Sequence, residues 1–444
     1  MAFDAPRHGR SRYRLSSHLA LVAAGAARQT AELPEARIRG HYEAAFLTGL
    51  AHDFGKYTSY VQDYLNSGVA NSYKDHAFIS ALWAAYLGKE WGLPARLQLI
   101  SFLSVLWHHR DLGDPEKYLL PRRKIEEDWA ALGEDGRRLE VAQKQVEDLG
   151  KGKREVARSL RCAARWAGNL LARRGLPIPI SSGYCWEEAL EAFLTSWRDI
   201  YASLFQLYRQ LRMQNDDLSP YFTMLKIFSS LIDADKLHAA RLGEQERRFL
   251  PPEAVEIYKR EMFNKREDSH LNLLRERIYQ NVRDRVTRWG LEHRFFTLTA
   301  PTGSGKTLTA LNAALLLRSQ IKERHGALPR IVYALPFTSI IDQNHEVLAG
   351  VLERTLPDFK REPSPYLLKH HHLADVIYRT DEEEDLGFNE AALLIESWQS
   401  EIVITTFVQF LHTLIGYRNR MLKKFNRLSH AIIIMDEVQN IPVE

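Results

Sequence analysis

Histidine and aspartate side chains that could hold divalent metal ions recur along the first half of the chain. His52 and Asp53 are adjacent at the end of an apolar helical segment and are followed by Gly55 and Lys56. Imidazole and carboxylate together suit Mn, Fe, Co or Ni, and a carboxylate also suits Mg. A single His-Asp pair often makes only a surface hydrogen bond, so a metal site needs further ligands. The candidates are His18, His76, His108, His109, Asp233 and Asp235.

The helical pattern of this half indicates how the candidates could meet. Apolar residues recur at helical spacing through 44–50, 57–65, 77–87, 97–107, 156–171, 186–208 and 221–237. Neither an internal repeat nor the alternation typical of strands occurs here. Neighbours on a helix point about 100° apart, so each doublet, His52-Asp53 or His108-His109, can reach two adjacent metal ions. Residues 1–248 therefore predict an all-α domain with ligands converging in a cleft.

Composition indicates a multi-domain globular protein. The 444 residues are 45% hydrophobic and 26% charged, and a formal net charge of +4 does not by itself indicate nucleic-acid binding. Cys162 and Cys185 are too few for a disulfide framework or a zinc ribbon and favour a reducing, cytoplasmic setting. Residues 19–27 superficially resemble a signal peptide, but Asp4 and His18 flank or enter the segment, which favours an ordinary helix. No apolar run approaches the roughly 18 residues of a membrane span.

A phosphate-binding motif begins the second half of the chain. Residues 300–307 match a Walker A motif, except that Ala300 takes the place of its first glycine. An expected strand at 294–300 precedes the motif and an expected helix at 308–318 follows it. Loop amides would cradle the phosphates of ATP, while Lys306 meets the β- and γ-phosphates and Thr307 contacts Mg²⁺. The predicted nucleotide-binding residues are Thr302, Gly303, Ser304, Gly305, Lys306 and Thr307.

Apolar runs at 330–336, 402–406 and 431–439, the last ending in acidic residues, predict buried strands of a parallel sheet covered on both faces. The last run carries Asp436, expected to hold Mg²⁺ through water, and Glu437, expected to orient the attacking water. Gln280, on an expected helix at 271–289, is a candidate for contacting adenine. The run His370-His371-His372 suggests a metal site, but a loop is the favoured interpretation.

The ligand series is similar to that of the HD superfamily. Its doubled histidine resembles the HD nuclease domain of the CRISPR-associated helicase–nuclease of type I systems. The resemblance implies that Asp53 bridges two metal ions and that Lys56 steadies a phosphate oxygen or the leaving group. It also implies that Asp235 rather than Asp233 is a ligand, because Ala-Asp-x-Leu is the sequence pattern of the family at this position. The remaining ligands would be His18 and His52 at the first metal and His76, His108 and His109 at the second.

The second half resembles the first RecA-like lobe of a superfamily 2 helicase. We expect an HD nuclease domain at 1–248 and a linker or connecting helix at 249–267. A charged helical insertion at 121–178 is expected to be solvated, which is favoured over a surface that follows DNA. A RecA-like lobe would follow at 268–444, truncated after the Walker B motif, so the helicase core is incomplete and the chain is expected to be a fragment. Residues matching the family's backbone-gripping positions are Thr338, Ser339, Thr405, Thr406 and Gln409.

The resemblance implies a metal-dependent single-stranded DNA nuclease, coupled in the full-length protein to an ATP-dependent 3′–5′ DNA helicase in type I CRISPR interference. Its catalytic residues would be His52, Asp53, Lys56 and Glu437. The expected cofactors are two divalent metal ions in the HD site and ATP with Mg in the helicase lobe. Single-stranded DNA and an RNA-guided CRISPR surveillance complex are the expected partners of a cytoplasmic, monomeric protein without membrane contact.

Two alternatives stay open. The first is an HD phosphohydrolase acting on nucleotides or small phosphoesters, with a regulatory ATP-binding lobe. The second is a non-catalytic module that binds ATP and a protein partner while its metal site stays idle. Substrate preference with Mn²⁺ separates the first alternative from a DNA nuclease, and alanine at His52 and Asp53 tests the second.

Overall fold

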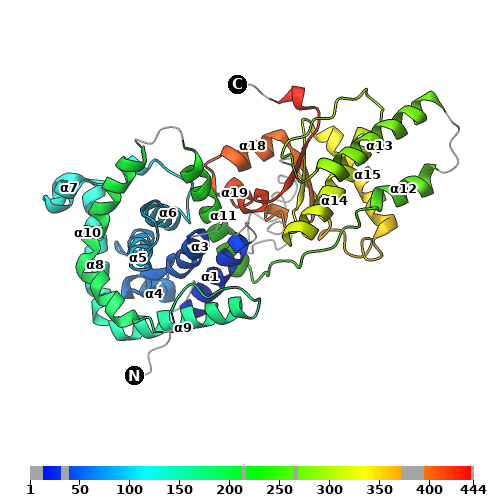
Figure 1. The fold of residues 1–444 in the computed structure, drawn as a ribbon. Helices are drawn as coiled ribbons and strands as arrows, with labels where there is room; N and C mark the ends of the chain where they lie inside the picture. The colour runs from blue at the N-terminus through cyan, green and yellow to red at the C-terminus, as the bar shows by residue number, and fades with distance from the viewer. Residues whose placement is uncertain are drawn as a thin grey trace. The chain divides into compact units, whose positions relative to one another are not determined.

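The computed structural model describes residues 14–31, 40–181, 183–212, 217–263, 269–371 and 395–441, and the chain forms two compact units (Figure 1). The first unit comprises Met1–Leu242 and Tyr417–Asn426, and the second comprises Gly243–Gly416 and Arg427–Glu444. The predicted boundary near residue 248 lies close to the observed one. Residues 417–426 differ from expectation, because the prediction assigns them to the second domain whereas they pack within the first unit.

The first unit is built of helices and turns, with no strand among the residues that the structure describes. The predicted helical runs all overlap observed helices, so the helical prediction is confirmed. None of the described helices is long and apolar enough to cross a bilayer. The helices are α1 (Leu15–Ala31), α3 (His41–Ala51), α4 (Ser59–Ser67), α5 (Ala77–Glu90), α6 (Ala95–Leu106), α7 (Arg122–Glu126), α8 (Glu134–Lys151), α9 (Lys153–Ala172), α10 (Trp186–Arg212), α11 (Ser219–Ala239) and α19 (Asn419–Leu422).

The core of this unit lies where α1 packs against α3 and α11, and where α5 packs against α6. Small residues bring α1 and α3 unusually close together. A Cβ added to Gly49 of α3 would lie 2.6 Å from the Cα of Ala23 on α1, so only glycine fits at this crossing. The close approach carries His18 of α1 toward His52, which follows α3 directly.

Helices α8 and α9 occupy the segment predicted as a solvated, charged insertion. Each buries one apolar face, which includes Leu139 and Leu149 on α8 and Leu160 and Ala163 on α9. Helix α9 packs against α1 and α10, and both α9 and α10 run along the outside of the helical unit in Figure 1. The solvated interpretation therefore holds only for the outer faces, because the apolar stripes of α8 and α9 complete the core.

The second unit contains a four-stranded parallel sheet in the order β2-β3-β1-β4. In register, Ile331 of β1 lies opposite Ile402 of β3 and Ile432 of β4. The strands are β1 (Ile331–Leu335), β2 (Leu367–His370), β3 (Ile402–Thr406) and β4 (Ile432–Met435). The described helices are α12 (Ala254–Phe263), α13 (His270–Trp289), α14 (Lys306–His325), α15 (Thr338–Thr355) and α18 (Phe407–Ile415), and α20 (Phe425–Leu428) spans the boundary between the two units at residue 426.

Helices cover both faces of the sheet, as the continuous apolar strands predict. Tyr333 and Ile404 belong to a buried cluster that includes Leu311 of α14 and Leu348 of α15. The intervening side chains, such as Val332, are also buried, and α18 packs against β1 and β3. This burial of both faces is typical of a parallel sheet. Strand β4 differs, because it lies at the edge of the described sheet and Ile433 is 40% exposed, so the prediction of a buried strand there is wrong.

Two further predictions for the second unit are wrong. Residues 294–300 form no strand, because this segment has no ladder partner among the described strands, and Phe295 is 92% exposed. The segment expected to be a linker or connecting helix at 249–267 contributes α12, and Ala254 and Val255 lie in the core of the unit. His370 belongs to β2 rather than to a loop and accepts a hydrogen bond from Trp398 Nε1 (2.6 Å). His372 lies outside the described residues.

Candidate metal centre and nucleotide site

Asp53 lies in a turn that a glycine holds against the next helix. After α3 the chain passes through His52 and Asp53 into a short 3₁₀ helix, Phe54–Tyr57. A Cβ added to Gly55 would lie 2.6 Å from Ile79 Cγ2 and 2.8 Å from the backbone oxygen of His76. The Gly55 amide also donates to Ser80 Oγ (2.8 Å). Gly55 thus lets the turn close onto the start of α5, where His76 is the N-cap residue.

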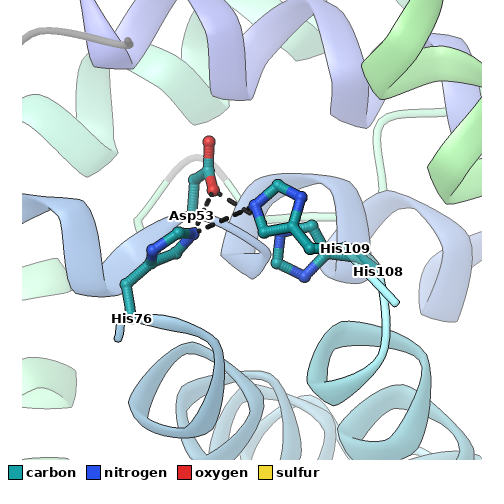
Figure 2. Close-up of side chains that lie close together, drawn as sticks. All are labelled: Asp53, His76, His108 and His109. Atoms are coloured by element: carbon teal, nitrogen blue, oxygen red, sulfur yellow. Dashed lines mark hydrogen bonds and ion pairs between the residues drawn. The ribbon is translucent and has the colours of Figure 1, made fainter. Parts of the chain in front are cut away.

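One group of ligand atoms gathers around Oδ1 of Asp53. His76 Nε2 lies 3.0 Å and His108 Nε2 lies 3.6 Å from this oxygen. His109 Nε2 lies 3.3 Å from His76 Nε2. Figure 2 shows Asp53 and the three imidazoles pointing toward one another, from the turn after α3, the start of α5 and the end of α6. Ligand atoms of these four residues all lie within 4.8 Å of one another.

A second group gathers around the other carboxylate oxygen of Asp53. His18 Nε2 and His52 Nε2 each lie 3.4 Å from Asp53 Oδ2, and the two nitrogens are 2.9 Å apart. Asp235 Oδ1, on α11, lies 3.2 Å from His18 Nε2 and 3.6 Å from His52 Nε2. Asp53 therefore faces one set of ligands with each oxygen. Lys56 Nζ donates to Oδ2 (2.7 Å), so it too reaches the shared carboxylate.

Asp235, and not its neighbour Asp233, faces the histidines. Asp233 Oδ2 accepts hydrogen bonds from Gln29 Nε2 (2.9 Å) and from Asn426 Nδ2 (3.3 Å). Both carboxylates are buried on α11, and Asp235 Oδ1 is close to His18 and His52. The role of Asp235 as a metal ligand stays a prediction.

The buried charges of the centre shift its protonation. Burial raises the pKa of Asp53, but Lys56 and His52 outweigh burial and hold that pKa well below its usual range. Burial lowers the pKa of His52, yet Asp53 and Asp235 raise it to about 10. His108 and burial lower the pKa of His109 to about 2. The carboxylates are therefore ionised and draw positive charge, which a metal would supply in place of the proton on His52.

The imidazole tautomers suit metal binding. His52 Nδ1 lies 2.8 Å from the backbone oxygen of Gly49, and His108 Nδ1 lies 2.6 Å from that of Val105. A proton on each Nδ1 satisfies these carbonyl groups and leaves Nε2 with a lone pair for a ligand. His108 Nε2 is buried and has no hydrogen-bond partner among the described residues. Because a buried polar atom without a partner is costly, the nitrogen and oxygen donors present fit a divalent cation.

His238 is the residue of this centre that the sequence did not indicate. Its Nδ1 lies 2.7 Å from His18 Nδ1, on the side of the ring opposite the ligand nitrogen. His238 follows Asp235 by three positions on α11, which places both on one face of the helix. This i, i+3 spacing is the signal that could have found it.

The phosphate-binding loop precedes α14 in the second unit, as the motif predicts. Gly303 and Gly305 have φ values of 77° and 83°, and α14 begins at Lys306. Lys306 Nζ lies 3.1 Å from Glu437 Oε1, and this contact lowers the pKa of Glu437. Asp436 Oδ2 accepts a hydrogen bond from Tyr333 Oη (3.0 Å). The loop lysine and the acids after β4 are therefore neighbours.

Helix α13 contacts the phosphate-binding loop through an arginine that the sequence did not indicate. Arg275 Nε donates to the backbone oxygen of Gly303 (2.8 Å). Gln280 Nε2 donates to Glu276 Oε1 of its own helix (2.8 Å), and no described contact joins Gln280 to the loop.

The predicted backbone-gripping residues lie at helix starts and at a strand end. Thr338 and Ser339 begin α15, and Thr406 ends β3. The Gln409 amide donates to Thr406 Oγ1 (3.1 Å). Thr405 Oγ1 and Gln409 Nε2 are buried without a hydrogen-bond partner among the described residues.

Comparison with known proteins gives one strong similarity. Residues 268–442 match the family described as type III restriction enzyme, res subunit. A Haloferax volcanii protein described as CRISPR-associated nuclease/helicase Cas3 is 30% identical over 466 aligned residues, which cover 97% of this chain and 45% of that protein. The chain thus spans less than half the length of this relative.

Two solved structures are similar at lower identity. The structure titled "Crystal structure of T. fusca Cas3-ATP" is 18% identical with a TM-score of 0.48, covering 98% of this chain and 46% of that one. The structure titled "Crystal structure of CRISPR-associated protein" is 14% identical with a TM-score of 0.44, covering 96% and 46%. Both TM-scores lie below 0.5, so these structures add nothing to the sequence match. That match, with the helicase-type segment at 268–442, makes this chain a Cas3-like protein.

Proposed function

We propose that the first unit is an HD-type, metal-dependent nuclease that cleaves single-stranded DNA. One observation carries the proposal: the buried Asp53 carboxylate faces His76 and His108 with one oxygen and His18 and His52 with the other. A carboxylate shared between two ligand groups is the arrangement that holds two cations side by side.

The residues of the centre have distinct proposed tasks. His18, His52 and Asp235 would hold one ion, His76, His108 and His109 the other, and Asp53 both. Two bound ions supply a water of lowered pKa and neutralise charge on a phosphodiester. Lys56, at 7% exposure beside Asp53, would place its ammonium group near a phosphate oxygen of the bound strand.

The second unit is proposed to bind ATP with Mg²⁺. Lys306 would exchange its contact with Glu437 for the β- and γ-phosphates, while Asp436 and Thr307 hold Mg²⁺. Glu437, freed from the lysine, would orient the attacking water. Support comes from the match of residues 268–442 to a restriction-enzyme helicase-type family.

In the full-length protein, we propose that ATP-driven 3′–5′ movement along DNA feeds the strand to the metal centre. The name of the Haloferax volcanii relative, a nuclease/helicase, supports this coupling. We also propose that the protein degrades invader DNA in type I CRISPR interference, recruited by an RNA-guided surveillance complex.

Cleavage assays with Mn²⁺ test the nuclease proposal. The chain should cleave single-stranded DNA and leave nucleotide monophosphates intact. Asp53→Asn should reduce cleavage more than about a hundredfold, because both ions lose their shared ligand, whereas loss of an outer partner costs about 10–100-fold. Asp63→Asn, at an exposed aspartate on α4, is the matched control and should cleave normally.

Two results would contradict the proposal. Hydrolysis of nucleotide monophosphates without DNA cleavage would establish the phosphohydrolase alternative. Equal DNA cleavage by the Asp53→Asn and Asp63→Asn variants would mean that the centre is idle.

A further inference from the structure

A short segment from the second half of the chain packs within the helical unit. Tyr417–Asn426 lies in sequence between α18 and β4, yet belongs to the first compact unit. The Leu112 amide donates to the backbone oxygen of Tyr417 (2.9 Å), and the Asn419 amide donates to Asp111 Oδ1 (2.8 Å). The segment therefore joins the chain that follows the His108-His109 doublet.

The side chain of Asn419 makes the most specific contacts of this segment. Its Nδ2 donates to the backbone oxygens of His108 (3.0 Å) and Arg110 (3.2 Å), and its Oδ1 accepts from Lys236 Nζ (2.5 Å). Asn419 is 8% exposed. Reversing the amide would set its NH₂ group against an ammonium and its oxygen against two carbonyls, so the partners dictate one orientation.

Asn419 contacts two segments, the turn after α6 and helix α11, and each of them carries candidate metal ligands. Helix α6 ends at Leu106, and residues 107–110 form turns whose carbonyls have left the helical hydrogen-bond ladder. His108 and Arg110 offer their carbonyl oxygens to Asn419. Lys236, the partner of Asn419 Oδ1, follows Asp235 directly on α11, and α19 packs against α11 (Figure 1).

We propose that Asn419 is a positioning residue of the metal centre. Its amide ties the turn that bears His108 and His109 to the helix that bears Asp235, and so fixes the separation of the two ligand groups. It touches neither ligand nitrogen and acts through backbone carbonyls and Lys236. The inference rests on the proposed function, because it concerns how tightly that centre holds its ions.

Calorimetric titration of the whole chain with Mn²⁺ tests this role. Asn419→Ser removes both bonds from the amide nitrogen and the acceptor for Lys236. The affinity for at least one Mn²⁺ should fall by about 10–100-fold, as it does when outer partners of metal ligands are lost. Asn426→Ser is the matched control: it removes an asparagine of the same segment that contacts Gln29 and Asp233 rather than the turn that bears His108 and His109.

The outcomes separate this inference from the proposed function. Equal Mn²⁺ affinity in wild type and Asn419→Ser, or equal losses in both serine variants, overturns the positioning role while leaving the nuclease intact. Absence of Mn²⁺ binding by the wild-type chain overturns the proposed function and the positioning role with it.

Metal-free circular dichroism establishes that each variant folds. If the Asn419→Ser variant does not fold, the Asp111→Ala variant replaces it. The exposed Asp111 side chain accepts a hydrogen bond from the backbone amide of Asn419. An Mn²⁺ affinity of Asp111→Ala equal to that of wild type then counts against the role, and a selective loss supports it.

Discussion

Both units bury acidic side chains, and they neutralise them in different ways. In the second unit, Glu401 Oε2 accepts hydrogen bonds from Arg318 Nη2 (2.6 Å) and Arg247 Nη2 (2.9 Å), and Oε1 accepts from Arg247 Nε (3.1 Å). In the first unit, Asp53 is equally buried and is surrounded by one permanent cation, Lys56, and by imidazoles, whose charge depends on a proton. Two permanent guanidinium charges thus face the single carboxylate of Glu401, whereas the metal centre sets one permanent ammonium charge against the carboxylates of Asp53 and Asp235.

The difference separates a structural cluster from a functional one. Glu401 joins the segment before α12, through Arg247, to α14, through Arg318, and both of its oxygens are satisfied. At the metal centre, His108 Nε2 is buried without a hydrogen-bond partner among the described residues and lies 3.6 Å from an Asp53 oxygen. A cation held between an imidazole nitrogen and a carboxylate oxygen would satisfy both groups.

The largest expected effect comes from a substitution that disrupts the cluster of Glu401, Arg247 and Arg318. Glu401→Gln should reduce the stability of the second unit by about 3–5 kcal/mol, because the buried guanidinium group of Arg318 and the partly buried one of Arg247 lose their counter-charge. Hydrogen exchange in denaturant, followed in peptides from β3, measures this loss, and peptides from α3 report the first unit. Mn²⁺ affinity should not change. Unaltered exchange in β3 would show that the arginines find other partners.

The same cluster predicts a pH dependence of stability. Burial raises the pKa of Glu401, but Arg247 and Arg318 outweigh it and lower the pKa. A carboxyl group with a depressed folded-state pKa stabilises the fold above its unfolded pKa. That stabilisation should be lost as the pH falls through the folded-state value, and Glu401→Gln should flatten this part of the profile.

The next largest effect comes from adding Mn²⁺, which would supply positive charge to the metal centre. Mn²⁺ at about 100 times its dissociation constant should stabilise the first unit by about 2.7 kcal/mol, because only the folded state assembles the ligands. Hydrogen exchange in α3 should slow, whereas exchange in β3 stays constant. Equal slowing in both regions would mean that Mn²⁺ binds without selecting the centre.

Two aspartates on α11 allow a smaller and more local comparison. Asp235→Asn should weaken Mn²⁺ binding by about 10–100-fold, because Asp235 Oδ1 lies near His18 and His52. Asp233→Asn should leave Mn²⁺ affinity nearly unchanged and should instead lower thermal stability, since Asp233 accepts bonds from Gln29 and Asn426. Calorimetry and thermal unfolding of both variants measure the two effects, and a reversed pattern would exchange the roles of the aspartates.

The candidate ligands were accessible from the sequence because their residue types are rare in apolar helices. His52-Asp53 and the His108 doublet stand at the ends of such helices, and the HD resemblance supplied the remaining positions. Local patterning also sufficed for the buried strands β1 and β3, for the position of β4 and for the position of the candidate phosphate-binding loop before α14. In each case the signal lies within a few neighbouring residues.

Features that depend on contacts between residues far apart in the chain could not be predicted from the sequence. The segment at 294–300 has an apolar composition typical of a strand but no described neighbour to pair with. Asn419 occupies an unremarkable position in sequence, and its partner His108 lies 311 residues away. The sequence left the segment containing α12 as either a linker or a connecting helix, because only two residues of α12, Ala254 and Val255, are buried. Tertiary contacts, and not local propensity, decide these elements.

His238 gives the smallest expected effect at the metal centre. His238 Nδ1 lies 2.7 Å from His18 Nδ1. If His18 carries its proton on Nδ1 and donates it to His238, the lone pair of His18 Nε2 is available to bind an ion. In His238→Ala the His18 ring can turn or take the other tautomer, so Mn²⁺ affinity should fall by about tenfold, the low end for outer partners of metal ligands. His238→Gln keeps an acceptor near His18 and should recover most of the affinity. Calorimetry on both variants distinguishes this role from packing, because a packing defect would lower thermal stability in both without recovery of Mn²⁺ affinity by glutamine.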